Sequence, residues 1–277
     1  MSKSSVISQG CSIGIIAGSG DLFSLILAEA LNRQLYPVMV SFNDLPLYQT
    51  GPHLRTSLGK IGEILDFFKI HNVEHIIFAG KVPRPSLTSL GFDATGIKWM
   101  QKLGIKAFSG DDALLKGITE LLSNEGFQII SPKDFLPKLI LKPGVYTSAH
   151  PNATDIQDIA RSQVVLNALS SADVGQACIV HEGLVLGVEA IEGTQNLIER
   201  CYALKRNPVG GVLVKIAKKN QTTLVDLPTI GVETITSVHK CGLNGIAISA
   251  NTTQVLDFNQ VINLCNQHSL FLKVIED

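Results

Sequence analysis

Four charged side chains in the second half of the chain stand beside apolar runs, in a pattern that could bind and cleave a phosphate ester. Glu189 and Glu192 follow one such run. Lys215 ends a second run, and Asp226 follows a third. A charged group at the end of a buried strand is costly unless it meets a partner, a metal or a charged ligand. Carboxylates and an ammonium at strand ends are the groups from which phosphate and divalent-metal sites are built.

Asp226 is the strongest single candidate for a catalytic or metal-binding residue. It follows Leu224-Val225 and precedes Leu227-Pro228. We therefore expect its carboxylate at the end of a strand over residues 222–225, with the backbone fixed by the proline. A carboxylate held there can bind Mg²⁺ or orient a water molecule, and hydrolysis of a phosphoanhydride requires both. The alternative is a structural cap or turn.

Glu189 and Glu192 stand where a predicted hairpin strand over residues 184–190 gives way to a helix. One of them would bind a metal or a sugar hydroxyl, and the other would only cap the helix. Lys215 lies in an apolar strand over residues 211–216, where its ammonium needs either a carboxylate or a ligand phosphate. The expected roles are catalysis by Asp226, Glu189 and Lys215, metal binding by Asp226 and Glu189, and substrate binding by Glu192, Gly193 and Thr194.

A turn of small residues near the N-terminus predicts a phosphate contact. Gly18-Ser19-Gly20 follows an apolar strand over residues 12–17 and precedes a helix over residues 22–34. Its backbone N–H groups could approach a phosphate at the positive end of that helix. As a dinucleotide-binding motif the pattern is incomplete, because Phe23 occupies the position of the third glycine. A purely structural turn is the alternative.

Two more candidate contacts lie in the N-terminal half. Lys81 and Arg84 fall in a proline-stiffened loop after a strand predicted over residues 73–79. Parallel sheets bind ligands at that edge, although a solvated loop explains the two charges equally well. Asp112 lies at the start of a helix predicted over residues 111–126 and could contact ribose or a metal. Acidic residues at a helix start also stabilise the helix without any further function.

These candidates need a framework that brings them together, and the chain predicts an α/β fold. In the first half, apolar strands alternate with amphipathic helices, which predicts a Rossmann-like domain with a parallel sheet over residues 1–135. Three prolines between residues 131 and 144 predict a linker over residues 136–145. A second α/β domain with a mixed sheet is expected over residues 146–277, with a hairpin over residues 177–190.

The composition restricts the class of partner. The formal net charge of the 277-residue chain is −1, which gives no electrostatic case for binding nucleic acid or an anionic membrane surface. A polyanionic ligand must therefore be neutralised by local groups. The chain is 45% hydrophobic, as expected for strands buried on both faces. Its five cysteines lack metal-type spacing and no apolar signal segment precedes Cys11, so we expect a cytoplasmic protein with reduced thiols.

Several segments together resemble the LpxI family, the UDP-2,3-diacylglucosamine pyrophosphatases of lipid A synthesis. They are Ile15-Ile16-Ala17-Gly18-Ser19-Gly20, Gly110-Asp111-Asp112, Asp173-Val174-Gly175-Gln176-Ala177, Val188-Glu189-Ala190-Ile191-Glu192-Gly193-Thr194, Gly210-Gly211-Val212-Leu213-Val214-Lys215 and Val225-Asp226-Leu227-Pro228-Thr229-Ile230-Gly231. The resemblance runs from about Ser12 to the C-terminus. It implies a cytoplasmic hydrolase that uses Mg²⁺ to cleave UDP-2,3-diacylglucosamine, a lipid-linked sugar nucleotide. The implied products are UMP and 2,3-diacylglucosamine 1-phosphate, with water attacking the α-phosphorus.

The same resemblance implies that Asp226 is the essential acid and that the ligand binds between the two domains. The chain departs from the family at Ser19, where a glycine is common, and in the loop Val82-Pro83-Arg84-Pro85. Peripheral contact with the inner membrane and a homodimer are left open. So are two alternative functions, a non-catalytic module that binds a sugar nucleotide and an NAD-dependent oxidoreductase.

Overall fold

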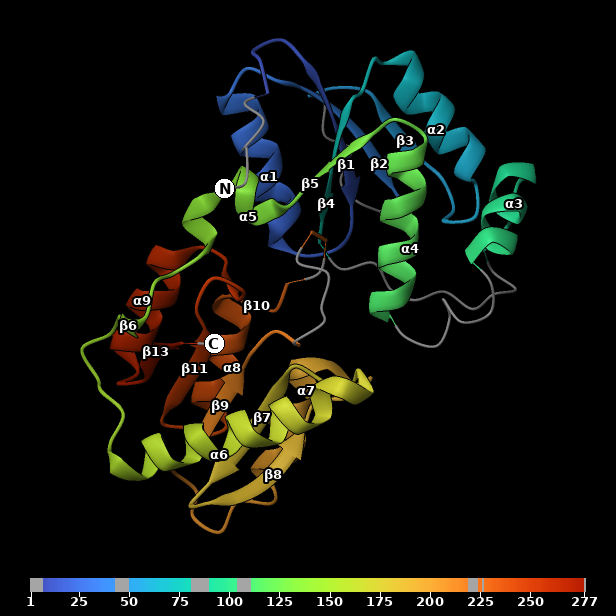
Figure 1. The fold of residues 1–277 in the computed structure, drawn as a ribbon. Helices are drawn as coiled ribbons and strands as arrows, with labels where there is room; N and C mark the ends of the chain where they lie inside the picture. Colours follow the sequence, from blue (N-terminus) through green and yellow to red (C-terminus); the bar gives the residue numbers. More distant parts are fainter. Residues whose placement is uncertain are drawn as a thin grey trace. The chain divides into compact units, whose positions relative to one another are not determined.

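The computed structural model describes residues 7–42, 50–80, 90–103, 111–218, 224–225 and 227–276. The chain divides into two compact units, residues 1–137 with 224–226 and residues 138–223 with 227–277. Figure 1 shows the helices and strands of both units, coloured along the sequence. Each unit is an α/β structure with its own sheet, parallel in the first and mixed in the second. The predicted fold class is confirmed.

The first unit is built on a five-stranded sheet in the order β3-β2-β1-β4-β5, in which all neighbours are parallel. Its strands are β1 (Ser12–Ala17), β2 (Tyr36–Ser41), β3 (His53–Arg55), β4 (His75–Ala79) and β5 (Gln128–Ile130). Its helices are α1 (Asp21–Asn32), α2 (Ile61–Ile70), α3 (Ala94–Leu103), α4 (Asp111–Asn124) and α5 (Pro132–Phe135). Both faces of β1 and β2 are buried, which explains why their sequences are continuous apolar runs.

The strand order reverses between β1 and β4, and such a switch point is where α/β sheets bind ligands. Here the Gly18 N–H donates a hydrogen bond to the Ala79 carbonyl at 2.8 Å. Gly80 has φ +100° and lies against the same turn, so that a β-carbon at this position would come within 2.6 Å of the Ser19 carbonyl oxygen. Close backbone packing therefore holds the turn after β1 against the end of β4.

The second unit is built on a six-stranded sheet in the order β6-β13-β11-β9-β7-β8, beside a two-stranded sheet of β10 and β12. Its strands are β6 (Gly144–Val145), β7 (Ala177–His181), β8 (Leu184–Val188), β9 (Val212–Lys215), β10 (Thr229–Ile230), β11 (Gly245–Ser249), β12 (Gln254–Val255) and β13 (Phe271–Ile275). Its helices are α6 (Ala153–Leu169), α7 (Gly193–Tyr202), α8 (Val232–Lys240) and α9 (Phe258–Gln267).

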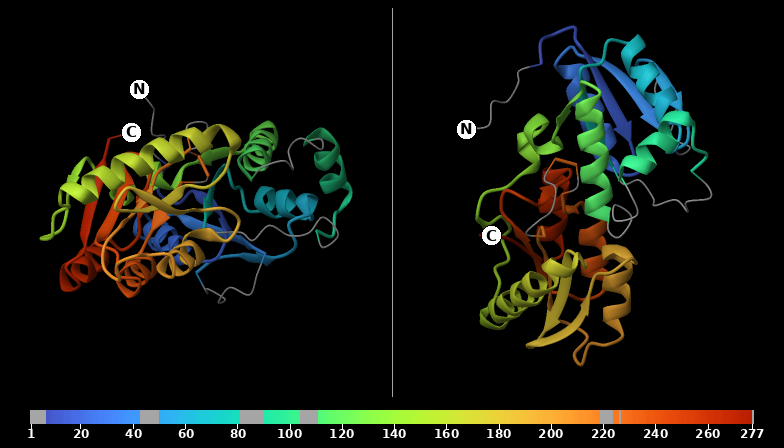
Figure 2. Two further views of the ribbon diagram at one scale, coloured as in Figure 1. Left: turned by 90° about the horizontal axis from the view of Figure 1, so that it is seen from below. Right: turned by 45° about the vertical axis from the view of Figure 1, so that its right-hand side comes forward.

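Two layers of helices cover this sheet. Cys178 and Val180 of β7 pack with α6 on one face, whereas Ala177 and Ile179 pack with α7, α8 and α9 on the other. Figure 2 shows this arrangement, with α6 on one side of the strands. The alternation along β7 follows from the two-residue repeat of a strand. Because both faces are covered, each side chain of β7 is buried.

Strand direction brings the ends of β8 and β9 to one edge of the sheet. The strands β9, β11 and β13 are parallel, and β7 is antiparallel to both β9 and β8. Therefore β8 runs in the same direction as β9. Glu189, which follows β8, and Lys215, which ends β9, consequently lie at the same edge of the sheet.

The expected strand over residues 222–225 is wrong in its described part, because Leu224 and Val225 form a turn. Leu224 is 41% exposed, so this apolar pair is not enclosed by neighbouring strands. The strands β3 and β5 and the helix α3 were not predicted. The two strands are only three residues long, too short to show a period. Helix α3 contains Gly96 and Thr95, which are weak helix formers.

The segment predicted as a linker, residues 136–145, contains a 3₁₀ turn at Pro137–Leu139 and the strand β6. Leu136 and Leu139 are buried. Strand β6 pairs antiparallel with β13 and so forms one border of the six-stranded sheet. Among the described residues, no helix is long and apolar enough to cross a membrane.

Candidate active site

The carboxylate of Glu189 is held in one direction at the end of β8. Its backbone N–H donates to the Ala177 carbonyl at 2.8 Å, which continues the pairing with β7. One carboxylate oxygen, Oε2, accepts from the Gln176 N–H at 3.2 Å, and the other, Oε1, accepts from the Thr194 hydroxyl at 2.7 Å. Hydrogen bonds to both oxygens restrict the orientation of the carboxylate.

Lys215 is the last residue of β9, and its side chain is buried, with 8% of the residue exposed. Its Nζ donates to the Thr194 hydroxyl at 2.8 Å and to the Thr229 carbonyl at 3.0 Å. A buried ammonium is stable only where hydrogen bonds replace its lost hydration. Thr194 and Thr229 each accept one such hydrogen bond from Lys215, and the Thr194 hydroxyl also donates to Glu189. A carboxylate, a hydroxyl and an ammonium are thus joined at the edge of the sheet.

The N-terminus of α7 supplies the hydroxyl that joins Glu189 to Lys215. Gly193 opens this helix with φ +79°, a backbone conformation that favours glycine, and Thr194 follows in the first turn. The end of a helix at which the backbone N–H groups are exposed carries a partial positive charge. That charge favours anionic groups beside Thr194, whether the Glu189 carboxylate or a ligand phosphate.

Glu192 is engaged differently from Glu189. Its Oε1 pairs with Arg200 Nη2 at 2.8 Å, and its Oε2 accepts from the Ala190 N–H at 3.1 Å. The hydrogen bond from Arg200 lowers the pKa of the Glu192 carboxyl below its usual value. Arg200 also donates to the Val188 carbonyl at 2.8 Å. The side chain of Glu192 therefore ties α7 to the end of β8.

Three hydroxyl side chains, which the sequence analysis did not single out, lie at the end of the neighbouring strand β11. The Ser249 Oγ lies 2.6 Å from Thr252 Oγ1 and 2.9 Å from Thr253 Oγ1. The Thr253 hydroxyl reaches the Lys215 carbonyl at 3.4 Å. In the sequence, these residues directly follow an apolar run, and this position is the signal that could have identified them.

Of the other residues predicted to contact a ligand, the structure describes some and not others. Asp226, Lys81 and Arg84 lie outside the described residues. Asp112 is the second residue of α4, and its side chain is also outside the description. In the first unit, Gly20 caps α1 with φ +97° and Ser19 is exposed at the turn. The turn therefore lies directly before the N-terminus of α1, which is the position that an anion site at a helix start requires.

The first unit also departs in detail from a dinucleotide-binding site. Phe23, at the position of the third glycine, is 3% exposed and is part of the buried face of α1. At the end of β2, where an NAD-binding fold commonly has an acid, Ser41 Oγ lies 2.8 Å from His53 Nε2. Burial, and next the nearby charge of Arg55, lower the pKa of His53. A neutral imidazole is thus favoured beside Ser41.

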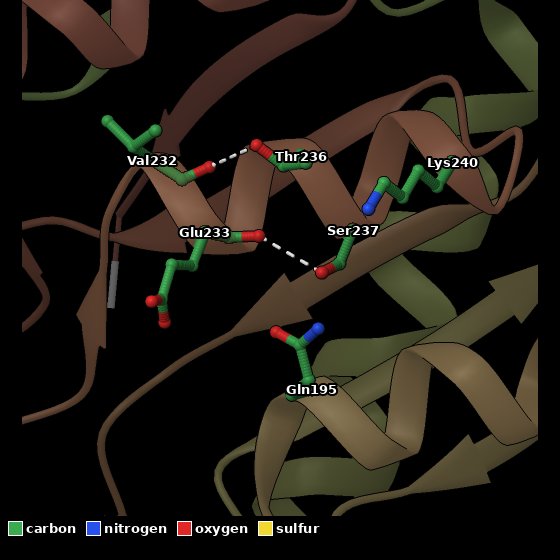
Figure 3. A pocket seen from close by; sticks show the side chains of 6 residues that line it. All are labelled: Gln195, Val232, Glu233, Thr236, Ser237 and Lys240. Carbon is green, nitrogen blue, oxygen red and sulfur yellow. Dashed lines mark hydrogen bonds between the residues drawn. The ribbon is translucent and has the colours of Figure 1, made fainter.

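A separate groove of about 480 Å³ lies between α7 and α8 in the second unit (Figure 3). It is lined by Gln195, Val232, Glu233, Thr236, Ser237 and Lys240. The Thr236 hydroxyl donates to the Val232 carbonyl at 2.9 Å, and the Ser237 hydroxyl donates to the Glu233 carbonyl at 3.0 Å. These hydroxyls are engaged within α8, and the groove includes none of the three joined side chains.

Together, these features define an α/β protein whose sheet edges are suited to anionic ligands. Comparison with known proteins identifies the family. The model of the LpxI N-terminal domain matches residues 12–139, and that of the LpxI C-terminal domain matches residues 142–273. The chain is 34% identical over 269 residues to the UDP-2,3-diacylglucosamine pyrophosphatase LpxI of Caulobacter vibrioides, covering 94% of this chain and 96% of the relative. The chain belongs to the LpxI family.

The family resemblance found in the sequence is thereby confirmed, as is the prediction that the protein is an enzyme. Two solved structures show weaker likeness. A GalE-like L-threonine dehydrogenase from Cupriavidus necator in its holo form is 16% identical, with a TM-score of 0.26, over 42% of this chain and 34% of that one. The precorrin-6A reductase CobK is 8% identical, with a TM-score of 0.34, over 96% and 88%. With TM-scores this low, neither structure indicates the function of this chain.

Proposed function

We propose that the protein hydrolyses the diphosphate of UDP-2,3-diacylglucosamine in lipid A synthesis, giving UMP and 2,3-diacylglucosamine 1-phosphate. The observation that carries this proposal is the 34% identity to a pyrophosphatase of that name over nearly the full length of both chains. The joined groups at the edge of the second sheet support it. They provide a carboxylate, a hydroxyl and an ammonium, which are groups that can bind a phosphate or offset the charge that develops on it.

The charge of the substrate makes local cations and donors necessary. A diphosphate ester brings two negatively charged phosphates, while the chain as a whole has a formal net charge of −1. The Lys215 ammonium, the start of α7 and the hydroxyls near Ser249 supply positive charge and hydrogen-bond donors at one edge. In a partly buried site such groups interact with phosphate more strongly than they would in water.

Glu189 is suited to share a magnesium ion with the substrate. Each of its carboxylate oxygens accepts one hydrogen bond and has a second lone pair. Mg²⁺ commonly takes one or two carboxylates from the protein and its other ligands from phosphate and water. Among the described residues, no group of three or more His, Cys, Asp or Glu side chains could hold a metal. We propose Glu189 and Asp226 as the ligands.

The bound metal would neutralise charge that develops on the phosphoryl oxygens. Asp226 would orient the attacking water and take up its proton. The water oxygen forms a bond to the α-phosphorus, and the bond from that phosphorus to the bridging oxygen breaks. The bridging oxygen keeps the electron pair and leaves with the sugar phosphate. Lys215 would bind the phosphate oxygens and offset their charge.

Product analysis tests this function directly. Purified protein is incubated with UDP-2,3-diacylglucosamine and Mg²⁺ in ¹⁸O-labelled water, and the products are identified by mass spectrometry. We expect release of UMP, with the label in UMP. Label in the sugar phosphate would mean attack on the other phosphorus, and no cleavage would contradict the proposed function.

A further inference from the structure

The hydrogen bonds of Thr194 have a fixed order of donors. The Glu189 carboxylate only accepts hydrogen bonds, and the Lys215 ammonium only donates them. Since Thr194 Oγ1 lies 2.7 Å from Glu189 and 2.8 Å from Lys215, its single hydrogen must point to the carboxylate, and its lone pair must face the ammonium. One neutral hydroxyl thus stands between a negative group and a positive group.

Helix α7 determines where this hydroxyl lies. Thr194 is in the first turn, and the β-branched side chain of threonine has few rotamers in a helix. The helix is anchored to the sheet by Leu197 and Ile198, which are 0% and 1% exposed. Asn196 also donates a side-chain hydrogen bond to the Glu192 carbonyl at 2.9 Å. The Thr194 hydroxyl is therefore placed by a packed helix rather than by a free loop.

We propose that Thr194 is a positioning residue that keeps the Lys215 ammonium and the Glu189 carboxylate apart and aimed at the edge of the sheet. This inference rests on the proposed function. If the two groups paired directly, each would neutralise the other, and less charge would be available for the phosphates and the metal. The hydroxyl instead donates to the carboxylate and accepts from the ammonium, so that Glu189 and Lys215 meet through Thr194 and not directly.

Substitution of Thr194 by valine and by serine tests this role. Valine keeps the shape but removes the hydroxyl, while serine keeps the hydroxyl. We expect Thr194→Val to lower kcat by roughly tenfold to a hundredfold with KM changed less than about threefold, because positioned polar groups act mainly in the transition state. Thr194→Ser should retain about a third of kcat or more. Retention of more than half of kcat by the valine variant, or equal loss by both variants, would overturn the proposal.

Thr236→Val is a matched control. This threonine lies in the neighbouring helix α8, and its hydroxyl donates to the Val232 carbonyl of its own helix. Its kcat should equal that of the wild type. If Thr236→Val lowers kcat as much as Thr194→Val does, the effect belongs to helix stability and the proposal fails.

A second measurement does not depend on the substrate. The urea midpoints of unfolding are compared for Thr194→Val, Lys215→Met and the double variant. Because the two side chains are in contact, we expect the double variant to lose less than the sum of the two single losses. Additive losses would overturn the proposed contact. If coupling is found but the wild type releases no UMP, the proposed function fails while the arrangement of Thr194 stands.

Discussion

Gly175 lies so close to Glu189 that a β-carbon at position 175 would come within 2.0 Å of the Glu189 carbonyl oxygen. Gly175 also has φ +62°, a conformation that L side chains rarely adopt. The adjacent Gln176 N–H donates to the Glu189 carboxylate. The turn before β7 therefore both packs against Glu189 and orients its side chain, and this relationship can be tested.

We expect Gly175→Ala to lower the free energy of unfolding by roughly 2–3 kcal/mol, since the strain of a positive φ is joined by a clash with backbone. The measurement is urea unfolding followed by circular dichroism. Gly183→Ala is the matched control, because Gly183 has φ +78° but nothing within 4 Å of the added carbon. It should lose only about 1 kcal/mol. Equal losses would contradict the close contact with Glu189.

Substitution of Asp226 should affect turnover far more than folding. We expect Asp226→Ala to lower kcat by two to three orders of magnitude, roughly 3–4 kcal/mol of transition-state stabilisation. Asp226→Asn should be nearly as slow, because it keeps the shape without the charge. Glu233→Gln, which changes an acid in the groove between α7 and α8, is the control and should keep wild-type kcat. If Asp226→Ala keeps more than about a tenth of wild-type turnover, Asp226 is not the catalytic carboxylate, and Glu189 is the next candidate.

Glu189 and Glu192 should separate in their dependence on magnesium. Glu189→Gln removes a charge that we propose for metal binding, so the Mg²⁺ concentration for half-maximal activity should rise roughly tenfold or more. Glu192→Gln loses a surface ion pair with Arg200 and should change that concentration less than about twofold. The measurement is the initial rate as a function of Mg²⁺, with excess EDTA as the blank. Full activity in EDTA, or the same response in both variants, would contradict the assignment.

His53 should make the first unit less stable in acid. Burial lowers its pKa in the folded protein below the ordinary value of 6.5. The unfolded chain therefore binds a proton first, so this contribution to stability is present above pH 6.5 and is lost as the pH falls below it. We expect His53→Gln to flatten the change of the unfolding midpoint between pH 7.5 and pH 5.5. His150→Gln, at an exposed position, should not flatten it. An unchanged slope in His53→Gln would refute this explanation.

Ile191 is fully exposed at 102%, two residues after Glu189 and beside the start of α7. A large aliphatic side chain in water next to the site suits contact with an acyl chain of the proposed substrate. We expect Ile191→Ser to raise KM for the diacyl substrate by about threefold to tenfold while kcat stays near that of the wild type. Val209→Ser, at a site that is 68% exposed, is the control and should leave KM unchanged. Equal KM values for both variants would exclude Ile191 from acyl binding.

Much of the fold could be predicted from local sequence. Runs such as Ile15-Ile16-Ala17 and Val38-Met39-Val40 are apolar without alternation, and strands buried on both faces of a parallel sheet require this pattern. The hairpin around Glu182-Gly183 was also predicted, because a glycine between two apolar runs indicates a tight turn. In the structure Glu182 and Gly183 have the positive φ values that such a turn needs. Local chemistry of this kind depends on neighbours in the chain, so it can be read without a structure.

For the site in the second unit, the sequence predicted candidate residues but not the contacts between them. Lys215 and Glu189 stood out because charge beside an apolar run is costly, but the sequence did not show which side chains Glu189 and Glu192 would contact. Their different contacts depend on where α7 begins and on the position of Arg200, eight residues beyond Glu192. No local pattern shows which of two nearby carboxylates will find that partner.

The joining of Glu189, Thr194 and Lys215 is a property of the tertiary structure alone. Thr194 and Lys215 are 21 residues apart, and they meet because β8 runs in the same direction as β9 with β7 between them. Strand direction and order arise from long-range pairing, which nearest-neighbour preferences do not contain. The sequence therefore specifies which charged residues are costly to bury. The pairing of the strands determines which of those residues come into contact.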